Sequence, residues 1–447
     1  MLIDDSPAAA PWRPSRGARP TLVTIAVAVF VAVLIALQVV ASRNGFEGPL
    51  QSLSRDYVGT PKSMSVPWAG LALALVGLTN RQRVVALAAA IGLDLVFLLG
   101  RLAVDGPVAI GNGPTLVLTG IGVVAAVRWS GDQRASALRG VALGALLIVA
   151  TKVGDVWLQI TVMTRPVVLD QYVELADRAL GSPSWVMGRV VDALGGAGYG
   201  VLHWVYIELP VAAIVVALYQ LRNGWPSHYL VRTFLAIGLI GPIFYLLFPV
   251  VGPDFAYGTA GAGSQLANLW PNVVPTGTDP SGFAFDTPAP RNCMPSLHTA
   301  WALSIFVHSR RGPRWLRWGG TFWLVCTLMA TLGFGYHYGV DLVAGAVLCL
   351  TLESALRDPE RGWGRFRVRL VVGGTVVFAA LLASYRYLAV PIAEYPMVSA
   401  PLILGSLAVV AVAFYASFFA APESGLGRWG GQRGDEDDIV PVGASQI

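Results

Sequence analysis

The chain has 447 residues, of which 55% are hydrophobic and only 13% are charged, and its formal net charge is +5. Soluble globular domains carry about 25% charged residues, so this composition excludes a soluble globular protein. The basic balance is typical of arginines in the loops on one side of a membrane and does not indicate a nucleic-acid partner. The three cysteines are too few and too scattered for a disulfide framework or a zinc site.

Apolar runs of about 20 residues, the length that spans a hydrocarbon core of about 30 Å, recur along the chain. Because lipid offers no hydrogen-bond partner to an open backbone, each run is predicted to be a helix. The first run, from Thr21 to Ala41, is longer than the apolar region of a signal peptide and is predicted to be retained. The predicted fold is therefore an all-α integral membrane protein with about twelve transmembrane helices, at residues 21–41, 65–79, 84–100, 114–128, 140–163, 198–221, 230–251, 295–309, 318–336, 339–357, 370–390 and 400–420.

The arginines predict the orientation of these spans. If the N-terminus is cytoplasmic, the loops on that side hold more than twice as many basic residues as the opposite loops, which is the positive-inside bias. Both termini are therefore predicted to lie in the cytoplasm, in a multi-pass protein of the plasma membrane. Two long outer loops result. Residues 164–197 suit a helix on the membrane surface, and residues 252–294 look irregular. Loops of that length usually carry function or are disordered.

The first motif with candidate chemistry is Pro295, Ser296, Leu297 and His298. Proline is favoured at the first position of a helix, and the N–H groups that follow can hold a phosphate at the positive end of the helix dipole. Ser296 adds a hydroxyl donor, and His298 lies in the first turn, facing the same anion. An ordinary helix start with an interfacial histidine explains this tetrapeptide alone equally well. Cys293 borders it and is predicted to be a packed thiol.

His337 and Asp341, four residues apart at the start of a later span, form the second motif. On a helix, this spacing places both side chains on one face. A carboxylate bound to one ring nitrogen fixes the tautomer and leaves the other nitrogen free to attack phosphorus. For this motif alone, an interfacial His–Asp pair near a helix end is the favoured interpretation.

Topology joins the two motifs. The arginine-rich turn at residues 310–317 lies halfway between His298 and His337, so each arm is about one spanning helix long. The chain therefore crosses the membrane and returns, which brings both histidines and Asp341 to one face at a similar depth. Together, the motifs predict a phosphoryl-transfer site on the non-cytoplasmic face.

The two motifs resemble segments of the type-2 phosphatidic acid phosphatase superfamily. Residues 294–298 match the Met-Pro-Ser-Leu-His segment of its inositolphosphotransferase branch, which includes the fungal inositol phosphorylceramide synthases, and residues 337–341 match the His-Tyr-x-x-Asp segment. The resemblance covers about residues 140–357 and implies a six-helix core within the larger membrane protein.

The resemblance also implies roles for the motif residues. His337 would be the nucleophile that forms a phosphohistidine, and Asp341 would orient it. His298 would protonate the leaving group and later activate the acceptor. No metal and no other cofactor is implied.

The chain departs from the superfamily pattern at the basic positions. Most superfamily phosphatases carry a Lys/Arg-Pro motif ahead of the Pro-Ser segment and a Ser-Arg pair before the second histidine. Residues 249–255 contain no basic residue, and Ala330 and Thr331 stand where the Ser-Arg pair is expected. Arg291 is therefore a candidate to supply charge to the phosphate, with a solvated loop arginine as the alternative. The predicted substrate-binding residues are Ser296, Leu297, Arg291, Thr331 and Tyr338.

Other polar residues in apolar runs are assigned structural parts. Lys152 is predicted to form a structural pair with Asp155 or Asp94, because charges at membrane depth are usually paired or face a cavity. His228 and His308 fall on the predicted cytoplasmic side, which argues against a part in catalysis.

The predicted organisation is a cytoplasmic tail (1–20), about four helices (21–139), the phosphoryl-transfer core (140–357), two C-terminal helices (358–421) and a disordered polar tail (422–447). The predicted function is a phosphoryl transferase that acts on a lipid-linked phosphate or phospholipid head group, with a polar alcohol such as inositol or a sugar as acceptor. A lipid phosphate or polyprenyl diphosphate phosphatase is the alternative with the same chemistry. A lipid transporter or binding protein with a vestigial site is the alternative of another class, although the sequence lacks the inverted repeats frequent in transporters.

Overall fold

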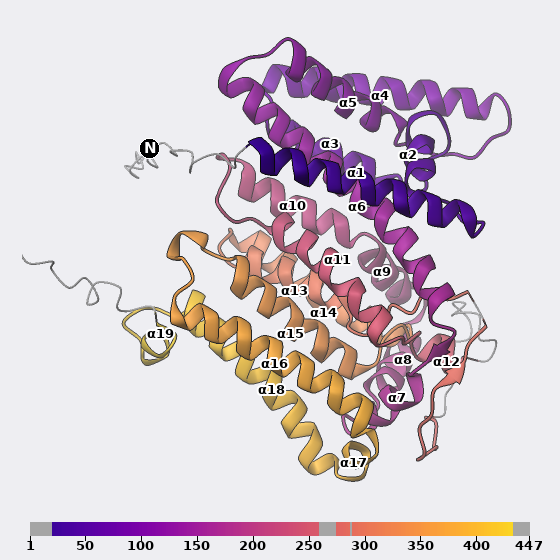
Figure 1. Ribbon diagram of the computed structural model, residues 1–447, viewed down its shortest axis with the longest axis vertical. Helices are drawn as coiled ribbons and strands as arrows, with labels where there is room; N and C mark the ends of the chain where they lie inside the picture. The colour runs from indigo at the N-terminus through magenta and orange to yellow at the C-terminus, as the bar shows by residue number, and fades with distance from the viewer. Residues whose placement is uncertain (1–19, 259–273, 287, 432–447) are drawn as a thin grey trace, which may run out of the picture.

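The computed structural model describes residues 20–258, 274–286 and 288–431, and nearly all regular structure in them is helical (Figure 1). The first group of helices is α1 (Pro20–Arg43), α2 (Pro49–Val58), α3 (Ser65–Leu75), α4 (Asn80–Leu102), α5 (Asn112–Val127) and α6 (Gly131–Thr164). The middle group is α7 (Asp170–Arg178), α8 (Pro183–Ala193), α9 (Gly195–Ile207), α10 (Leu209–Leu221), α11 (Leu230–Leu247), α12 (Pro253–Tyr257), α13 (Leu297–Ser309), α14 (Arg314–Gly333) and α15 (Gly339–Leu356). The last group is a 3-10 turn (Pro359–Arg361), α16 (Arg365–Tyr387), α17 (Ala389–Glu394), α18 (Pro396–Phe418) and α19 (Gly425–Trp429).

Each predicted span contains a helix, but fewer helices than predicted meet the length and composition of a membrane span. Six do so within the described residues, namely α4, α6, α11, α15, α16 and α18. The pair α9 and α10 would add a seventh, bent by 56° at its break. Helix α13 has 13 residues and is about 20 Å long at 1.5 Å per residue, too short to cross alone. The helical membrane class is confirmed, whereas the count of about twelve transmembrane helices is not.

The break between α9 and α10 has a local cause. Glu208 caps α10, and Pro210 occupies its first turn. Proline supplies no backbone N–H and its ring crowds the preceding turn, so a continuous helix is interrupted there. The predicted sixth span is therefore a bent pair of short helices.

The first group is held together by small residues and one buried ion pair. A Cβ on Gly144 would lie 2.1 Å from the carbonyl oxygen of Gly70, so these glycines let α3 and α6 approach backbone to backbone. Lys152 of α6 lies 2.8 Å from an Asp56 carboxylate oxygen of α2, and both side chains are buried. Lys152 thus has a structural partner, but neither of the two carboxylates predicted for it.

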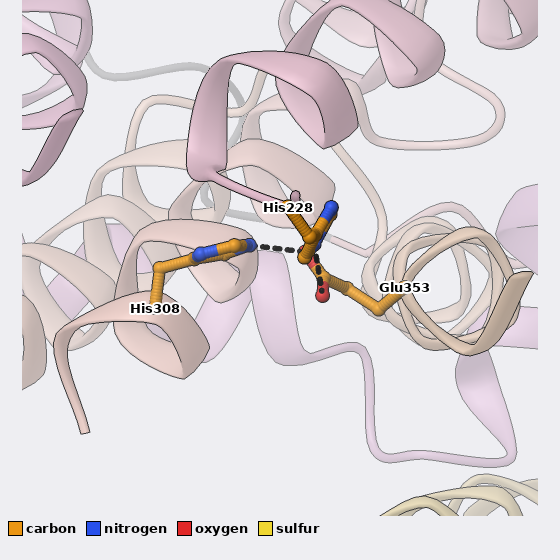
Figure 2. A group of neighbouring side chains, drawn as sticks. All are labelled: His228, His308 and Glu353. Carbon is orange, nitrogen blue, oxygen red and sulfur yellow. Dashed lines mark hydrogen bonds and ion pairs between the residues drawn. The ribbon is translucent and has the colours of Figure 1, made fainter. Parts of the chain in front are cut away.

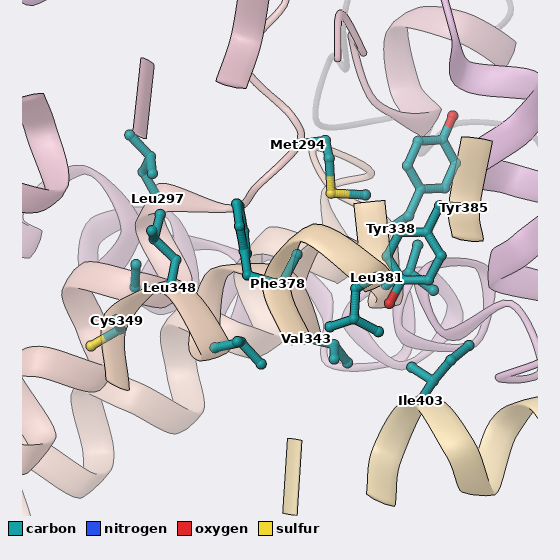
Figure 3. Packing of buried hydrophobic residues seen from close by; sticks show 14 of the residues in the cluster. Met294, Leu297, Tyr338, Val343, Leu348, Cys349, Phe378, Leu381, Tyr385 and Ile403 are labelled. Atoms are coloured by element: carbon teal, nitrogen blue, oxygen red, sulfur yellow. The ribbon is translucent and has the colours of Figure 1, made fainter. Parts of the chain in front are cut away.

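Helix α15 forms the centre of the middle group, and most of its residues are buried. It packs against α11, α13, α16 and α18. Figure 3 shows Val343 of α15 among apolar side chains of neighbouring helices, including Phe378 of α16 and Leu297 of α13. A Cβ on Gly345 would lie 2.2 Å from the carbonyl oxygen of Ser296. Glycine at this position therefore allows the start of α13 to rest on α15.

The two long loops contain more structure than predicted. Residues 164–197 form α7 and α8, and α7 packs against α15, α16 and α17 as a largely buried element. Strands β1 (Val167–Val168) and β2 (Phe283–Ala284) pair antiparallel and tie this segment to the second loop. In Figure 1, α7, α8 and α12 gather on the right of the bundle, whereas α1 begins and α19 lies on the left.

The predicted tails fall largely outside the described residues, at 1–19 and 432–447. The short helix α19 lies inside the segment that was predicted to be a disordered tail from residue 422.

Candidate active site

The first side of the site is the start of α13. The helix begins at Leu297 with Ser296 as its N-cap, whose side chain accepts a hydrogen bond from the Thr299 N–H. The sequence had predicted Pro295 at the first helical position. Pro295 instead precedes the N-cap residue, Ser296. The Ser296 hydroxyl also accepts from the Thr299 hydroxyl, which leaves its own proton available. The N–H groups of the first helical turn have no partner within a helix, so this start can offer donors to an anion.

The second side of the site is the turn before α15. His337 lies in this turn, because α15 begins only at Gly339 with Tyr338 as its N-cap. Its backbone is held by a bond from its N–H to the Thr331 carbonyl and by a 2.6 Å bond from the Ser184 hydroxyl to its own carbonyl. The prediction that His337 and Asp341 share one helical face is therefore wrong, because only Asp341 lies in α15. The turn before the helix nevertheless places the His337 ring beside Asp341.

Asp341 lies beside the ring but is shared. His337 Nδ1 is 3.5 Å from Asp341 Oδ2. The same oxygen accepts a 2.8 Å bond from the Tyr338 N–H and a 2.6 Å bond from the Cys293 thiol. Asp341 is fully buried. The carboxylate is therefore fixed in place by two closer donors, and the histidine is its third and most distant neighbour.

The two histidines meet at the same end of α13 and α15, as the topology predicted. Their ring centroids are 6.4 Å apart. Tyr206 of α9 stacks on the His298 ring, with centroids 4.1 Å apart, and its hydroxyl lies 3.2 Å from His298 Nδ1. Tyr336 lies against Tyr206, at 5.3 Å between centroids. Sequence reasoning missed Tyr206, although its spacing of seven residues from Tyr199 on one helix was a signal of an aromatic face.

Three of the predicted substrate-binding residues have their polar atoms engaged with the protein. The Thr331 hydroxyl donates within α14, and the Tyr338 hydroxyl donates to Asp170 Oδ1 at 3.0 Å. Arg291 is buried and donates to the carbonyl oxygens of Arg165 and Phe285 in the loops beneath the site. Ser296 and Leu297 lie at the α13 start. Roles in phosphate binding stay predictions for all five.

Helix α7 adds carboxyl groups that the sequence reasoning overlooked. Asp170 accepts hydrogen bonds from the N–H groups of Val251 and Gly252, and Asp177 accepts one from Val340 N–H. Burial raises the pKa of Asp170 to about 7, and it raises the pKa of Asp177 well above its usual range. These groups fix the loop before α12 and the first turn of α15. The spacing of seven residues between them, which places both on one face of α7, was the available signal.

A second polar cluster lies at the opposite ends of α13 and α15 (Figure 2). His308 Nε2 is 2.7 Å from Glu353 Oε1, and His228 Nε2 is 3.4 Å from Glu353 Oε2. Arg357 also reaches Glu353, at 3.1 Å. Both histidines thus lie at the opposite end of these helices from the candidate active site, and their having no part in catalysis stays a prediction.

Comparison with known families assigns two parts of the chain. The model of the PAP2 superfamily matches residues 190–353, which contain both candidate catalytic histidines. A domain of unknown function, DUF5933, matches residues 21–160, the first group of helices. Neither the curated proteins nor the solved structures gave a match. The chain therefore carries a PAP2 superfamily domain. This domain and the multi-pass helical fold fit an enzyme, a membrane lipid phosphatase or phosphotransferase.

Proposed function

We propose that the protein is a membrane phosphotransferase of the inositolphosphotransferase type, which moves a phospholipid head-group phosphate to a polar alcohol through a phosphohistidine on His337. The observation that carries the proposal is the meeting of His298 and His337, 6.4 Å apart between ring centroids, with Asp341 beside the second ring. The bias of basic loops favours a site on the non-cytoplasmic face of the plasma membrane.

In the first half-reaction, the phosphate lies at the start of α13. His337 attacks phosphorus through Nε2 while Nδ1 keeps its proton toward Asp341. A P–N bond forms, the bond from phosphorus to the lipid oxygen breaks, and protonated His298 gives its proton to that oxygen. The 3.5 Å separation of Nδ1 and Oδ2 must shorten for this step, as is common for catalytic hydrogen bonds that tighten only when substrate is bound.

In the second half-reaction, His298 acts as a base. It takes the proton of the acceptor hydroxyl, the acceptor oxygen attacks phosphorus, and the P–N bond breaks. The hydroxyl of Tyr206 faces His298 Nδ1, so the proton that is transferred would be carried on Nε2. Tyr206 is thus placed to act as a positioning residue for the acid and base.

The charge around the site favours a transferase over a monoester phosphatase. In the described part of the chain, no lysine or arginine forms an ion pair with His337 or Asp341, and the neighbouring groups on α7 are carboxyls. A phosphodiester carries one negative charge, whereas a phosphomonoester carries nearly two at neutral pH. Because an uncompensated buried charge is costly, the diester suits this site better.

The test uses purified protein with labelled phospholipids, lipid phosphates and polyprenyl diphosphates, each with and without inositol or a sugar. A phosphorylated acceptor that appears only with the alcohol present supports the proposal. Release of inorganic phosphate without an acceptor would identify the phosphatase alternative. Wild-type turnover in His337→Ala and His298→Ala would refute the mechanism, and trapping of label on His337 would support it.

A further inference from the structure

Three side chains with metal-binding atoms lie close together in the candidate active site, and one of them is His337. Cys293, His337 and Asp341 each offer one ligand atom, and these atoms all lie within 4.8 Å of one another. Two of the separations are 2.6 Å between sulfur and Oδ2 and 3.5 Å between Nδ1 and Oδ2. Around a tetrahedral zinc ion, with bonds of about 2.0 to 2.3 Å, ligand atoms lie about 3.2 to 3.6 Å apart. A shift of about 1 Å of the thiol would bring the separation of sulfur and Oδ2 into that range.

Two polar atoms in this group lack hydrogen-bond partners. They are His337 Nδ1 and Asp341 Oδ1, on side chains that are 4% and 0% exposed. A buried polar atom without a partner is costly and is rare in folded proteins. His337 Nδ1 belongs to the candidate ligand set, so a bound cation would satisfy this atom. The separations given above are to Asp341 Oδ2, and a cation that bound Oδ1 as well would satisfy the second atom.

The cluster of Figure 2 has similar ligand types but different electrostatics. Arg357 already neutralises Glu353. Gln220 accepts the Leu230 N–H through Oε1, so its amide nitrogen faces His308 Nδ1. His308 must then carry its proton on Nε2 and donate it to Glu353, which leaves no lone pair for a metal. Both ring nitrogens of His308 are thus engaged, although His228 Nδ1 has no hydrogen-bond partner. The positive charge of Arg357 at Glu353 is what sets this cluster apart.

The group at the active site has no such compensation. No lysine or arginine of the described residues forms an ion pair with Asp341. A bound cation would supply to Asp341 the positive charge that Arg357 supplies to Glu353.

We propose that a thiophilic divalent cation of the zinc class binds Cys293 Sγ, His337 Nδ1 and an Asp341 oxygen, and that it switches the site off. Binding releases the thiol proton, because a thiolate is the ligand. An imidazole bound through Nδ1 carries its remaining proton on Nε2, so that nitrogen has no lone pair with which to attack phosphorus. The inhibitory consequence rests on the proposed function, whereas the binding site does not.

The binding is tested with Co²⁺, which reports a thiolate ligand by an intense near-ultraviolet charge-transfer absorption. We expect this band when the purified wild-type protein is titrated with Co²⁺, and its loss when Zn²⁺ is added in excess. Cys293→Ser and Cys293→Ala should both lack the band. Cys349→Ser is the matched control, since Cys349 is also buried, and it should retain the band. Absence of the band in wild type, or its persistence in both Cys293 variants, overturns the site.

The consequence is tested by phosphoryl transfer in a zinc titration, with reversal by a chelator. Each variant is compared with its own zinc-free rate. We expect at least about tenfold more Zn²⁺ for half-inhibition of Cys293→Ser than of wild type or Cys349→Ser, because one of three ligands is weakened. A thiolate band with no inhibition keeps the site but contradicts His337 as the nucleophile. Zinc activation that depends on Cys293 overturns the switch.

Discussion

Gly345 offers a direct test of how α13 and α15 build the site. An added Cβ would lie 2.2 Å from the Ser296 carbonyl oxygen and 3.1 Å from its carbonyl carbon. An ordinary contact needs about 3.4 Å, so Gly345→Ala must move the α13 start away from α15 by about 1 Å, because backbone cannot rotate aside as a flexible side chain can. That displacement separates the start of α13, where the phosphate is proposed to bind, from His337 and Asp341. A misplacement of about 1 Å can lower turnover by about 100-fold, and overpacking costs about 1 to 3 kcal/mol of stability.

Gly373→Ala in α16 is the matched control, since nothing lies within 4 Å of its added Cβ. It should keep wild-type turnover and equal or better stability, as alanine favours a helix more than glycine does. The assay is phosphoryl transfer from a labelled lipid, with thermal unfolding in detergent measured on the same preparations. If Gly345→Ala kept turnover within about twofold of the control, the close contact would not set the site geometry, and the reasoning from α13 packing would be wrong.

Three further predictions concern other parts of the molecule. Tyr206→Phe removes the hydroxyl 3.2 Å from His298 Nδ1 but keeps the stacked ring, so turnover should fall about tenfold with a displaced pH profile; an unchanged profile would contradict its positioning role. The pKa of Asp170 is raised to about 7 in the folded state, so the folded protein keeps this proton to a higher pH than the unfolded chain does. The free energy of unfolding should therefore fall by up to about 4 kcal/mol as pH rises from about 4 to 7. Asp170→Asn should flatten that part of the stability profile, as followed by thermal unfolding at several pH values. Glu353→Gln leaves the buried Arg357 without its carboxylate and should cost about 3 to 5 kcal/mol, whereas adding Arg357→Gln should restore part of the loss; equal stability of both variants would argue that the pair is not coupled.

The sequence predicted the helices and the meeting of the two motifs because both depend on patterns along the chain. Apolar runs locate the helices, and two helix-length arms around an arginine-rich turn suffice to bring His298 and His337 to one end. The same patterns do not report how far each helix extends across the membrane. The bend at Glu208 and the short α13 arise from prolines and capping residues. An average of hydropathy over about 20 residues does not detect such single residues.

Side-chain partners from distant segments could not be predicted. Asp155 lies three residues after Lys152 in the sequence, yet the partner of Lys152 is Asp56 of α2, because α2 folds against α6 at that depth. Cys293 looked like a packed thiol, and it is buried, but it also donates to Asp341. That contact depends on the turn before α15, which the prediction of a common helical face for His337 and Asp341 did not contain.

Contacts at both ends of α13 and α15 determine how the two helices lie relative to one another. Both helices start at the catalytic candidates and end at the network of His308 and Glu353. Gly345 of α15 holds the start of α13 in close contact. A slip of one residue along a helix displaces a side chain by about 1.5 Å, more than a phosphoryl-transfer site tolerates. A buried, charge-neutralised network remote from the chemistry resists such a slip, because any shift would leave buried charges unpaired. The cluster of His228, His308, Glu353 and Arg357 is therefore best understood as the contact that sets the relative position of α13 and α15 along their axes.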